Sequence, residues 1–318
     1  MSTEFDLIDR FFSRSSPAAK LGVGDDAALV EPSAGHDLAM TMDTLVSGVH
    51  FSPNCEPRAL GHKALAVNLS DLAAMGARPR WVMLAITLPA IDEAWLEDFA
   101  GGFYDLAQRY DVALIGGDTT HGPLSLTVAA TGEVAADKAL RRDGARAGDE
   151  VWVSGHIGSA ALALRHRRGE LRLKGGDLDI CSTRLDRPAP RIELGEALVG
   201  VASSAIDVSD GLVADAGHIA QRSGVRIEIR YDAVPVIAGL MHLKADHGVR
   251  SAVLAGGDDY ELLFTVPAHA AGQLDRVSAT LGLALTRIGV VVPGSGVAVL
   301  DSSGSVIDVG SGGYDHFE

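Results

Sequence analysis

The pattern of apolar and polar positions predicts strands and helices that alternate along the first half of the chain. Strand-like apolar runs lie at residues 37–46, 81–89, 111–117 and 124–134. A helix is expected from Pro57 to about Met75, because apolar residues recur there at helical spacing and Gly76 follows as a stop signal. A second helix starts near Asp92 and carries aromatic residues at helical spacing, which is typical of a buried face.

A basic segment dotted with glycine, residues 139–149, interrupts this pattern and marks the expected domain boundary. We therefore expect an N-terminal domain of residues 1–138 and a C-terminal domain of residues 139–318. In the second half, strands are predicted at 150–155, 225–230, 259–266, 285–292 and 297–300, and helices at 158–167, 191–202 and 268–281. Both halves mix helices and strands, so the predicted fold class is α/β with mixed, α+β-like sheets. A chain of 318 residues is long enough for two such domains.

Composition and charge narrow the classes of partner. The chain is 47% hydrophobic and 22% charged, which indicates a globular protein, and its 27 Lys and Arg against 42 Asp and Glu give a net charge of -15. Such a charge repels a nucleic-acid backbone and an anionic membrane surface. The N-terminus lacks the features of a signal peptide, and Cys55 and Cys181 have no metal-type spacing. We expect a cytoplasmic protein that binds neither nucleic acid nor membranes.

Aspartates recur beside small residues at the ends of apolar runs. The segment GVGDDAALV sets Asp25 and Asp26 side by side at an apparent turn running into a strand. Further examples are Asp43, Asp71, Asp118, Asp207, Asp210, Asp258 and Asp259. Strand ends and the loops after them are where α/β folds build sites. Any single one of these aspartates is adequately explained as a turn or capping residue.

The whole set, however, has few lysines or arginines nearby to balance it. Asp71 and Asn68 are three residues apart and share one face of a helix that we expect to be amphipathic, where an unpaired carboxylate would be costly. Hard divalent cations with oxygen ligands can offset such a set, and Mg²⁺ suits carboxylates shared with substrate phosphates.

The usual nucleotide-binding signatures are missing. No glycine-rich loop ends in Gly-Lys-Ser/Thr, and no protein-kinase motif set is present. GVGDDA imitates a dinucleotide fingerprint, but two carboxylates would face the pyrophosphate and Pro32 leaves no room for the required helix. There is also no convincing Ser, His and Asp triad and no reactive-cysteine context. Metal-assisted phosphoryl transfer is the chemistry that remains.

The motifs together resemble those of the thiamine-monophosphate kinases, within the aminoimidazole ribonucleotide synthetase superfamily. They are GVGDDAALV, TMDTLVSGVHF, GHKALAVNLSDLAAMGARP, LIGGDTT, SAIDVSDGL, GGDDYEL and GGYDHF, and they span nearly the whole chain. The resemblance implies transfer of the γ-phosphoryl group of ATP to thiamine monophosphate. It also implies a homodimer formed through the sheet of the N-terminal domain, a C-terminal α/β domain, and an active site in the cleft between the two domains.

The resemblance also implies roles for individual residues. Several Mg²⁺ ions would be held by Asp26, Asp43, Asp71, Asp118, Asp207 and Asp210, with help from Thr41 and the main chain of Met42, and Asp43 and Asp210 would be catalytic. Gly117, Asp118, Arg142 and Ser209 would contact the nucleotide, and His50, Asp258 and Tyr314 would contact the thiamine substrate. Two positions depart from the family pattern: Asp258 replaces a frequent glutamate, and Ser311 replaces a tryptophan found in some members.

The chemistry expected of the residues agrees with such a reaction. A phosphate monoester is already ionised near neutral pH, so its oxygen can attack without a general base. Three alternatives stay open at this point. They are another ATP-using enzyme of the superfamily, a metal-dependent phosphatase, and a non-catalytic protein that binds Mg²⁺ or nucleotide.

Overall fold

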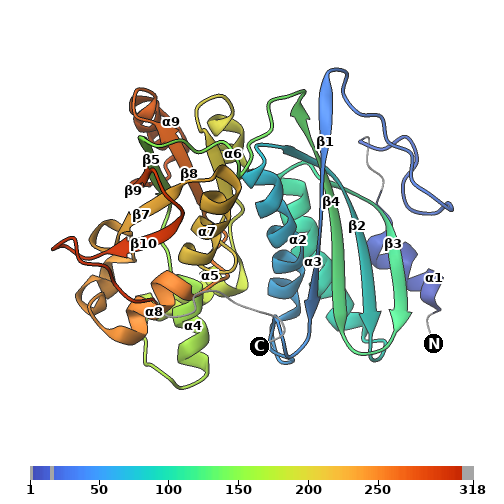
Figure 1. Cartoon of the computed structure of the whole chain (residues 1–318). Helices are drawn as coiled ribbons and strands as arrows, with labels where there is room; N and C mark the ends of the chain where they lie inside the picture. The colour runs from blue at the N-terminus through green and yellow to red at the C-terminus, as the bar shows by residue number, and fades with distance from the viewer. Residues whose placement is uncertain (1–2, 15–17, 310–318) are drawn as a thin grey trace. The chain divides into compact units, whose positions relative to one another are not determined.

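The structure is a computed structural model that describes residues 3–14 and 18–309 (Figure 1). The chain forms two compact units. The first comprises residues up to Leu72 together with Ala77–Asp137, and the second comprises Ala73–Gly76 together with the chain from Lys138 onward. Each unit has its own sheet.

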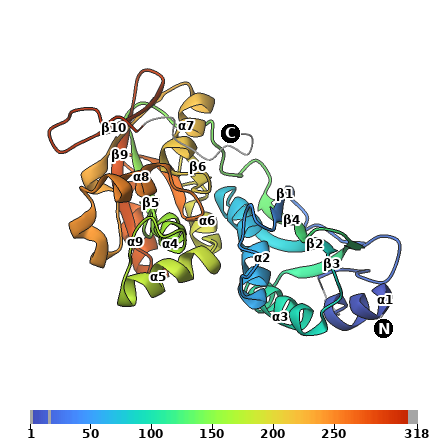
Figure 2. The same ribbon diagram turned by 90° about the horizontal axis from the view of Figure 1, so that it is seen from below.

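The first unit is a four-stranded sheet with helices on one face. Its strand order is β1 (His36–Val46), β4 (Ser125–Ala135), β2 (Arg78–Leu88) and β3 (Ala113–His121). The β2–β3 pair is parallel and the other pairs are antiparallel. The helices α2 (Pro57–Ala74) and α3 (Glu93–Arg109) cover one side of the sheet (Figure 2). The short α1 (Glu4–Leu7) continues into a π-helical turn (Ile8–Phe12) near the N-terminus.

Alternation along the strands separates the two faces of this sheet. Leu84 and Val128 pair with each other and are buried on the helix side. In the neighbouring row, Met42, Ala129 and Met83 pair across three strands, and Met42 is 67% exposed. Because successive side chains point to opposite faces, these methionines lie on the face without helices.

The helix α3 forms where its sequence predicts it. The Asp92 side chain accepts N–H groups of Ala94 and Trp95 and so caps the first turn. Phe99 and Phe103 are fully buried, and the rings of Trp95 and Phe99 stack with centroids 5.2 Å apart. The aromatic stripe is therefore core, as expected.

The second unit is built on a six-stranded sheet. Its strand order is β10 (Gly296–Leu300), β7 (Arg226–Arg230), β9 (Leu285–Val292), β5 (Asp149–Ser154), β8 (Leu262–Pro267) and β6 (Ser204–Asp207). Only the β10–β7 pair is parallel among these ladders. The helices are α4 (Ser159–Arg167), α5 (Gly175–Asp186), α6 (Ile192–Leu198), α7 (Leu212–Ser223), α8 (His247–Ala255) and α9 (Leu274–Leu281), with 3-10 turns at Tyr231–Ala233, Ala238–Leu243 and Ala271–Gln273. Helices and mixed sheets in both units confirm the predicted fold class.

Several local expectations were wrong. Residues 20–30 form no strand; Leu21 and Leu29 meet in an isolated bridge, and the chain reverses at Gly24, whose φ is +117°. The strand expected from residue 259 starts at Leu262, since Asp258 and Tyr260 have φ of +68° and +49°.

The helices also differ from expectation in extent. The helix expected over 191–202 covers Ile192–Leu198, and the one expected from 268 begins at Leu274 after a 3-10 turn. The pattern gave no sign of α5 or α8. The helix α2 is buried on nearly all sides rather than along one stripe, because small residues such as Ala66 and Ser70 are buried as well.

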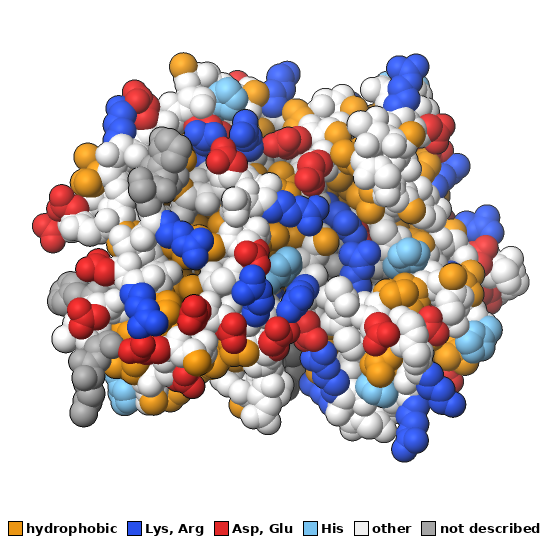
Figure 3. Space-filling view, turned by 180° about the vertical axis from the view of Figure 1, so that it is seen from behind, with side chains coloured by type: hydrophobic (Ala, Val, Ile, Leu, Met, Phe, Trp, Pro, Cys, Tyr) orange, Lys and Arg blue, Asp and Glu red, His pale blue; other side chains and the backbone are white. Residues whose placement is uncertain are grey.

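Within the described residues, no helix is long and apolar enough to cross a membrane. On the face shown in Figure 3, acidic and basic side chains are interspersed rather than separated into single-sign areas.

Candidate active site

The first unit brings together three of the predicted metal ligands, Thr41, Asp43 and Asp71. Thr41 and Asp43 lie on β1, and the Thr41 hydroxyl donates to Oδ2 of Asp71 on α2 at 2.5 Å. The Asp43 N–H donates to Oδ1 of Asn68 at 3.0 Å, and the Asn68 amide in turn donates to the Ala64 carbonyl at 3.1 Å. Asn68 is fully buried. This amide therefore ties the β1 backbone to α2 and fixes where Asp43 lies relative to Asp71.

Gly117 and Asp118 lie on β3, at the other edge of the same sheet. Gly117 pairs with Leu84, which pairs with Val128, which pairs with Asp43. Three strand spacings of about 4.8 Å separate the Cα atoms of Gly117 and Asp43 by about 14 Å. Within the first unit, Asp118 is thus not part of the Asp43 cluster.

Gly117 has a local reason to be glycine. Its φ is +156°, and a Cβ atom at this position would lie 1.8 Å from the Leu84 carbonyl oxygen. The absence of a side chain lets β3 pair closely with β2 just before the exposed Asp118.

His50 lies in the turn after β1 with one ring nitrogen already engaged. Its Nδ1 accepts the Val46 N–H at 3.0 Å, and its backbone N–H donates to the Val46 carbonyl at 2.9 Å. A ring nitrogen that accepts an N–H carries no proton, so in the neutral ring the proton is on Nε2. His50 is therefore oriented to donate from Nε2.

Asp25 and Asp26 lie exposed at the turn of residues 20–30. The Asp25 carboxylate accepts the N–H of Asp26 at 2.8 Å, which stabilises the turn. The described contacts of Asp26 are thus local ones, and they do not connect it to the Asp43 cluster.

The second unit brings together Asp207, Ser209, Asp210 and Asp258. The first three lie at the end of β6 and in the loop that leads to α7. The Ser209 carbonyl accepts the N–H of Asp258 at 2.9 Å, and the Tyr260 hydroxyl donates to Oδ1 of Asp258 at 3.1 Å. Asp207 is buried and Asp210 is partly exposed.

Two further residues of this cluster escaped the sequence prediction. Asp215 and His218 lie on α7, and with Asp210 they offer ligand atoms that all lie within 4.8 Å of one another. Burial first, and then the Asp210 charge, raise the pKa of Asp215 to about 7, although backbone hydrogen bonds act in the opposite direction. The sequence contained a signal for this pair, because Asp215 and His218 are three residues apart on one helix and therefore share one of its faces.

Arg142 lies away from this cluster. Its carbonyl accepts the Ser223 hydroxyl at 2.8 Å, at the C-terminal end of α7. A helix of 12 residues is about 18 Å long, so the Arg142 backbone lies at the opposite end of α7 from Asp210.

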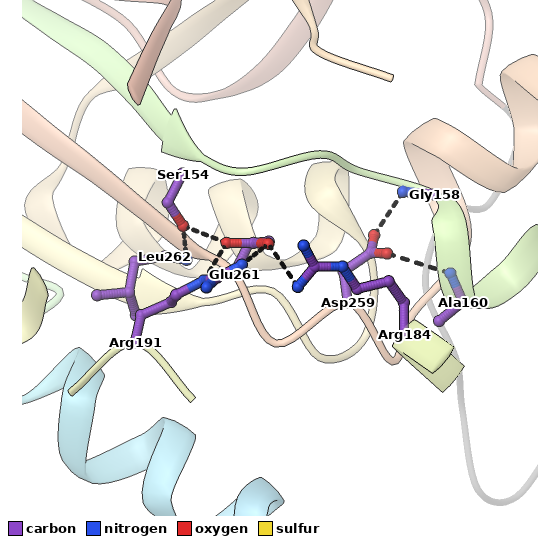
Figure 4. A network of polar contacts seen from close by, with 8 residues as sticks. All are labelled: Ser154, Gly158, Ala160, Arg184, Arg191, Asp259, Glu261 and Leu262. Atoms are coloured by element: carbon purple, nitrogen blue, oxygen red, sulfur yellow. Dashed lines mark hydrogen bonds and ion pairs between the residues drawn. The ribbon is translucent and has the colours of Figure 1, made fainter. Parts of the chain in front are cut away.

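The segment GGDDYEL is anchored by two buried carboxylates that flank Tyr260 (Figure 4). Asp259 accepts the N–H groups of Gly158 at 2.6 Å and Ala160 at 3.5 Å, at the start of α4. Complete burial is the main cause that raises the pKa of Asp259 to about 8, with a further contribution from the charge of Glu261.

Glu261 is 1% exposed and lies at the centre of a network of hydrogen bonds and ion pairs. Both of its oxygens accept N–H groups of Arg191, and its Oε2 also accepts the Ser154 hydroxyl at 2.5 Å. Arg184 lies 3.9 Å from its Oε1 atom. Ser154 accepts the Leu262 N–H at 2.9 Å, which fixes the start of β8. The network thus holds the backbone that carries Asp258.

Tyr314 and Ser311 lie outside the described residues. Some of the other predicted site residues gather in two groups, one on the helix side of the first sheet (Thr41, Asp43 and Asp71) and another at the β6–α7 loop (Asp207, Ser209, Asp210 and Asp258). Asp26, Asp118 and Arg142 belong to neither group.

Comparison with known proteins shows similarity along the whole chain. Residues 24–134 match the AIR synthase related protein, N-terminal domain, and residues 146–302 match its C-terminal domain. The chain is 45% identical over 319 residues to the thiamine-monophosphate kinase of Escherichia coli strain K12, covering 99% of this chain and 98% of the relative. The chain belongs to the thiamine-monophosphate kinase family.

Solved structures of thiamine-monophosphate kinases share the fold. The enzyme from Stenotrophomonas maltophilia K279a matches with 48% identity and a TM-score of 0.88, covering 96% of this chain and 98% of that one. A structure described as AaThiL complexed with AMPPCP and TMP matches with 33% identity and a TM-score of 0.78, covering 100% and 99% of the two chains. The hydrogenase maturation protein HypE, at 22% identity and a TM-score of 0.78, shares the fold alone.

Membership of the thiamine-monophosphate kinase family confirms the resemblance inferred from the motifs. The family model of the N-terminal domain includes both β1 and α2, and that of the C-terminal domain includes the β6–α7 loop. Both clusters of aspartates therefore lie in the parts of the chain that define the family.

Proposed function

We propose that this chain transfers the γ-phosphoryl group of ATP to the phosphate of thiamine monophosphate. The bond from the γ-phosphorus to the bridging oxygen of ADP breaks, a bond from that phosphorus to an acceptor phosphate oxygen forms, and thiamine diphosphate and ADP leave. The observation that carries this proposal is full-length similarity to thiamine-monophosphate kinases, together with a similar structure described as holding AMPPCP and TMP.

The donor set fits Mg²⁺ as the resident cation. In the first unit the Thr41 hydroxyl and the Asp71 carboxylate lie 2.5 Å apart, and Asp43 is held to the same helix through Asn68. These are hard oxygen donors, and hard oxygen donors favour Mg²⁺ over softer metals. The ions would be held by Asp26, Asp43, Asp71, Asp118, Asp207 and Asp210, with Thr41 and the main chain of Met42. When bound, Mg²⁺ neutralises the phosphates and aligns them for in-line transfer.

The residues of the chain would bind and orient the two substrates. His50, whose ring is held in place by the Val46 N–H on Nδ1, would contact thiamine monophosphate. Asp258, whose carboxylate is held by the Tyr260 hydroxyl, and Tyr314 would contact the thiamine moiety. Gly117, Asp118, Arg142 and Ser209 would contact the nucleotide. No residue needs to act as a general base, since the acceptor phosphate is already ionised.

We also propose that the chain forms a homodimer through the open face of its first sheet. Met40 and Met42 are 71% and 67% exposed, and Met83 lies in the same row as Met42. Ala18, Ala28 and Val30 pack on Trp81 and cover part of this face, but the exposed methionines leave an apolar area of the kind that marks association surfaces. Sedimentation of the Met42→Glu variant as a monomer would support this, and an unchanged molecular mass would contradict it. An ATP-dependent reaction also favours a cytoplasmic location.

A coupled product assay tests the kinase proposal. Purified protein is incubated with Mg²⁺, ATP and thiamine monophosphate, and ADP and thiamine diphosphate are separated by chromatography. Equal amounts of the two products, abolished by a chelator, are expected. Phosphate release without thiamine diphosphate would indicate a phosphatase, and ATP binding without turnover would indicate a non-catalytic protein.

Two substitutions link the assay to the site. Asp43→Asn and Asp210→Asn are expected to remove turnover while the fold is kept, because they alter charge neutralisation rather than core packing. Asp105→Asn is the matched control, since this exposed carboxylate pairs with Arg58 on the surface and should leave activity unchanged.

A further inference from the structure

One buried carboxylate lies under the loop that carries Ser209 and Asp210. Asp215 belongs to the first turn of α7 and is 2% exposed. Its Oδ2 atom accepts the backbone N–H groups of Ser209, Asp210 and Gly211, each at 3.1 Å. A single oxygen therefore binds three consecutive amides.

Three consecutive N–H groups that converge on one anion form the kind of nest that nucleotide-binding proteins often offer to phosphate. Here the chain fills the nest with its own carboxylate. While Asp215 holds these amides, they are not available to a phosphate group. An anionic substrate group near this loop would need other donors or a cation, and a cation would suit the neighbouring Asp210 carboxylate.

The loop held by Asp215 also determines where neighbouring segments lie. The carbonyl of Ser209 accepts the N–H of Asp258 at 2.9 Å, and the carbonyl of Val208 accepts that of Tyr260 at 2.8 Å. Gly211 has a φ of +126°, and a Cβ atom there would lie 2.9 Å from the Ala255 backbone. The loop has little freedom to move as a whole, so losing its central anchor would mainly disturb the Ser209–Gly211 backbone itself.

We propose that Asp215 is a positioning residue that holds Asp210 in place to bind a divalent cation. This inference rests on the proposed function, because it assigns the cation to the phosphoryl-transfer site. Asp215 acts through the backbone of Asp210 rather than as the essential ligand. An asparagine at this position keeps an oxygen that can accept the N–H groups, whereas an alanine leaves all three without their acceptor.

The test measures Mn²⁺ binding to the full-length protein by electron paramagnetic resonance, with Mg²⁺-dependent activity recorded in parallel. For Asp215→Ala, at least a tenfold weaker Mn²⁺ affinity is expected, with an equal rise in the Mg²⁺ concentration needed for half-maximal rate. For Asp215→Asn, both values are expected to stay within about threefold of the wild type. An equal loss of Mn²⁺ affinity in both variants would overturn the inference. It would show that cation binding needs the negative charge of Asp215 and not only its acceptor oxygen.

A matched control separates positioning from general destabilisation. Asp149 is also buried in the second unit and accepts the Arg146 N–H at 2.9 Å and the Ser203 hydroxyl at 2.6 Å, outside the candidate site. Asp149→Ala should lower the melting temperature and leave Mn²⁺ affinity unchanged. A shift in Mn²⁺ affinity as large as that of Asp215→Ala would overturn the inference.

These experiments distinguish failure of the proposed kinase function from failure of the positioning role of Asp215. If the wild type makes no thiamine diphosphate, the proposed function fails, and the Mn²⁺ comparison still decides the role of Asp215. If the wild type is active and Asp215→Ala keeps wild-type Mn²⁺ affinity, the positioning role fails and the kinase proposal stands.

Discussion

Replacing Arg191 by methionine is expected to destabilise the second unit by about 3 kcal/mol, because it removes the closest counterion of a buried glutamate. Two N–H groups of Arg191 bind the two oxygens of Glu261, and the Arg191 side chain is only 13% exposed. Hydrogen bonds to charged groups contribute about 1.5–3 kcal/mol each, so two give about 3–6 kcal/mol. Ser154 and the more distant Arg184 remain near Glu261, which places the expected loss at the lower end of that range.

Hydrogen exchange followed by mass spectrometry measures this loss where it occurs. Peptides that cover β5 and β8 report the opening free energy of the strands beside Glu261. Arg167→Met is the control, since Arg167 makes the same two-bond fork with Asp186 but both side chains are about a third or more exposed. A surface pair of this kind contributes less than about 1 kcal/mol.

The reasoning depends on burial, so one comparison refutes it. If Arg191→Met lowers protection in β5 and β8 no more than Arg167→Met does, desolvation is not what makes the Glu261 pair costly to break. In the double variant Arg191→Met/Glu261→Leu, at least half of the lost stability should return, because no uncompensated charge is then buried.

Three further substitutions test other parts of the structure. Gly117→Ala should lower the free energy of unfolding, measured in urea, by about 3 kcal/mol, because its Cβ would meet the Leu84 backbone. Gly116→Ala should leave this free energy nearly unchanged, because the nearest atom to its Cβ would be 4.0 Å away. Asn68→Ala should cost about 1–3 kcal/mol and raise the Mg²⁺ requirement, since the Asp43 N–H loses its partner; a stable variant with normal Mg²⁺ dependence would contradict this. The raised pKa of Asp259, about 8 against an ordinary 3.8, means that the folded state retains a proton that the unfolded state has lost, so stability should fall between pH 4 and 8. Asp259→Asn, which cannot ionise, should flatten that fall in thermal melts recorded across the same range, and an unchanged slope would exclude Asp259 as its source.

Elements with strong local signals could be predicted from the sequence. The helix α3 has a capping aspartate and an aromatic stripe, and both signals lie within the segment itself. The helix α5 begins with two glycines and buries only Cys181 and Leu185 among its residues, so its periodicity is weak. The formation of α5 depends on packing against α4 and against the hydrophobic core of the second unit, and no local sequence pattern reveals these contacts.

The start of β8 shows a second limit of local prediction. The apolar run suggested a strand from residue 259, but the positive φ values of Asp258 and Tyr260 interrupt the extended backbone. Residues other than glycine adopt this conformation rarely, and here the buried side chains of Asp259 and Glu261 hold the segment from both sides. The cause is thus a set of contacts with α4 and Arg191, which are distant in sequence.

In the candidate site, too, some features follow from local sequence spacing and others from contacts between distant segments. The three-residue spacing of Asn68 and Asp71 predicts a shared helix face, and the structure places Asp43 against that face. The separation of Asp118 from Asp43 could not be predicted, because it follows from the strand order β1-β4-β2-β3. Nothing in the motif itself says that LIGGDTT forms the edge strand on the opposite side from β1.

The two aspartate clusters are built on the same physical principle in different folds. In the first unit a buried amide, Asn68, accepts the N–H of Asp43; in the second a buried carboxylate, Asp215, accepts the N–H of Asp210. In both cases a buried oxygen acceptor holds the backbone of the candidate ligand in place. Each unit thus fixes the position of its own acidic group through an anchored backbone amide. That arrangement suits a protein of net charge -15 that must bind two phosphate-bearing substrates, because cations can then enter and leave with them.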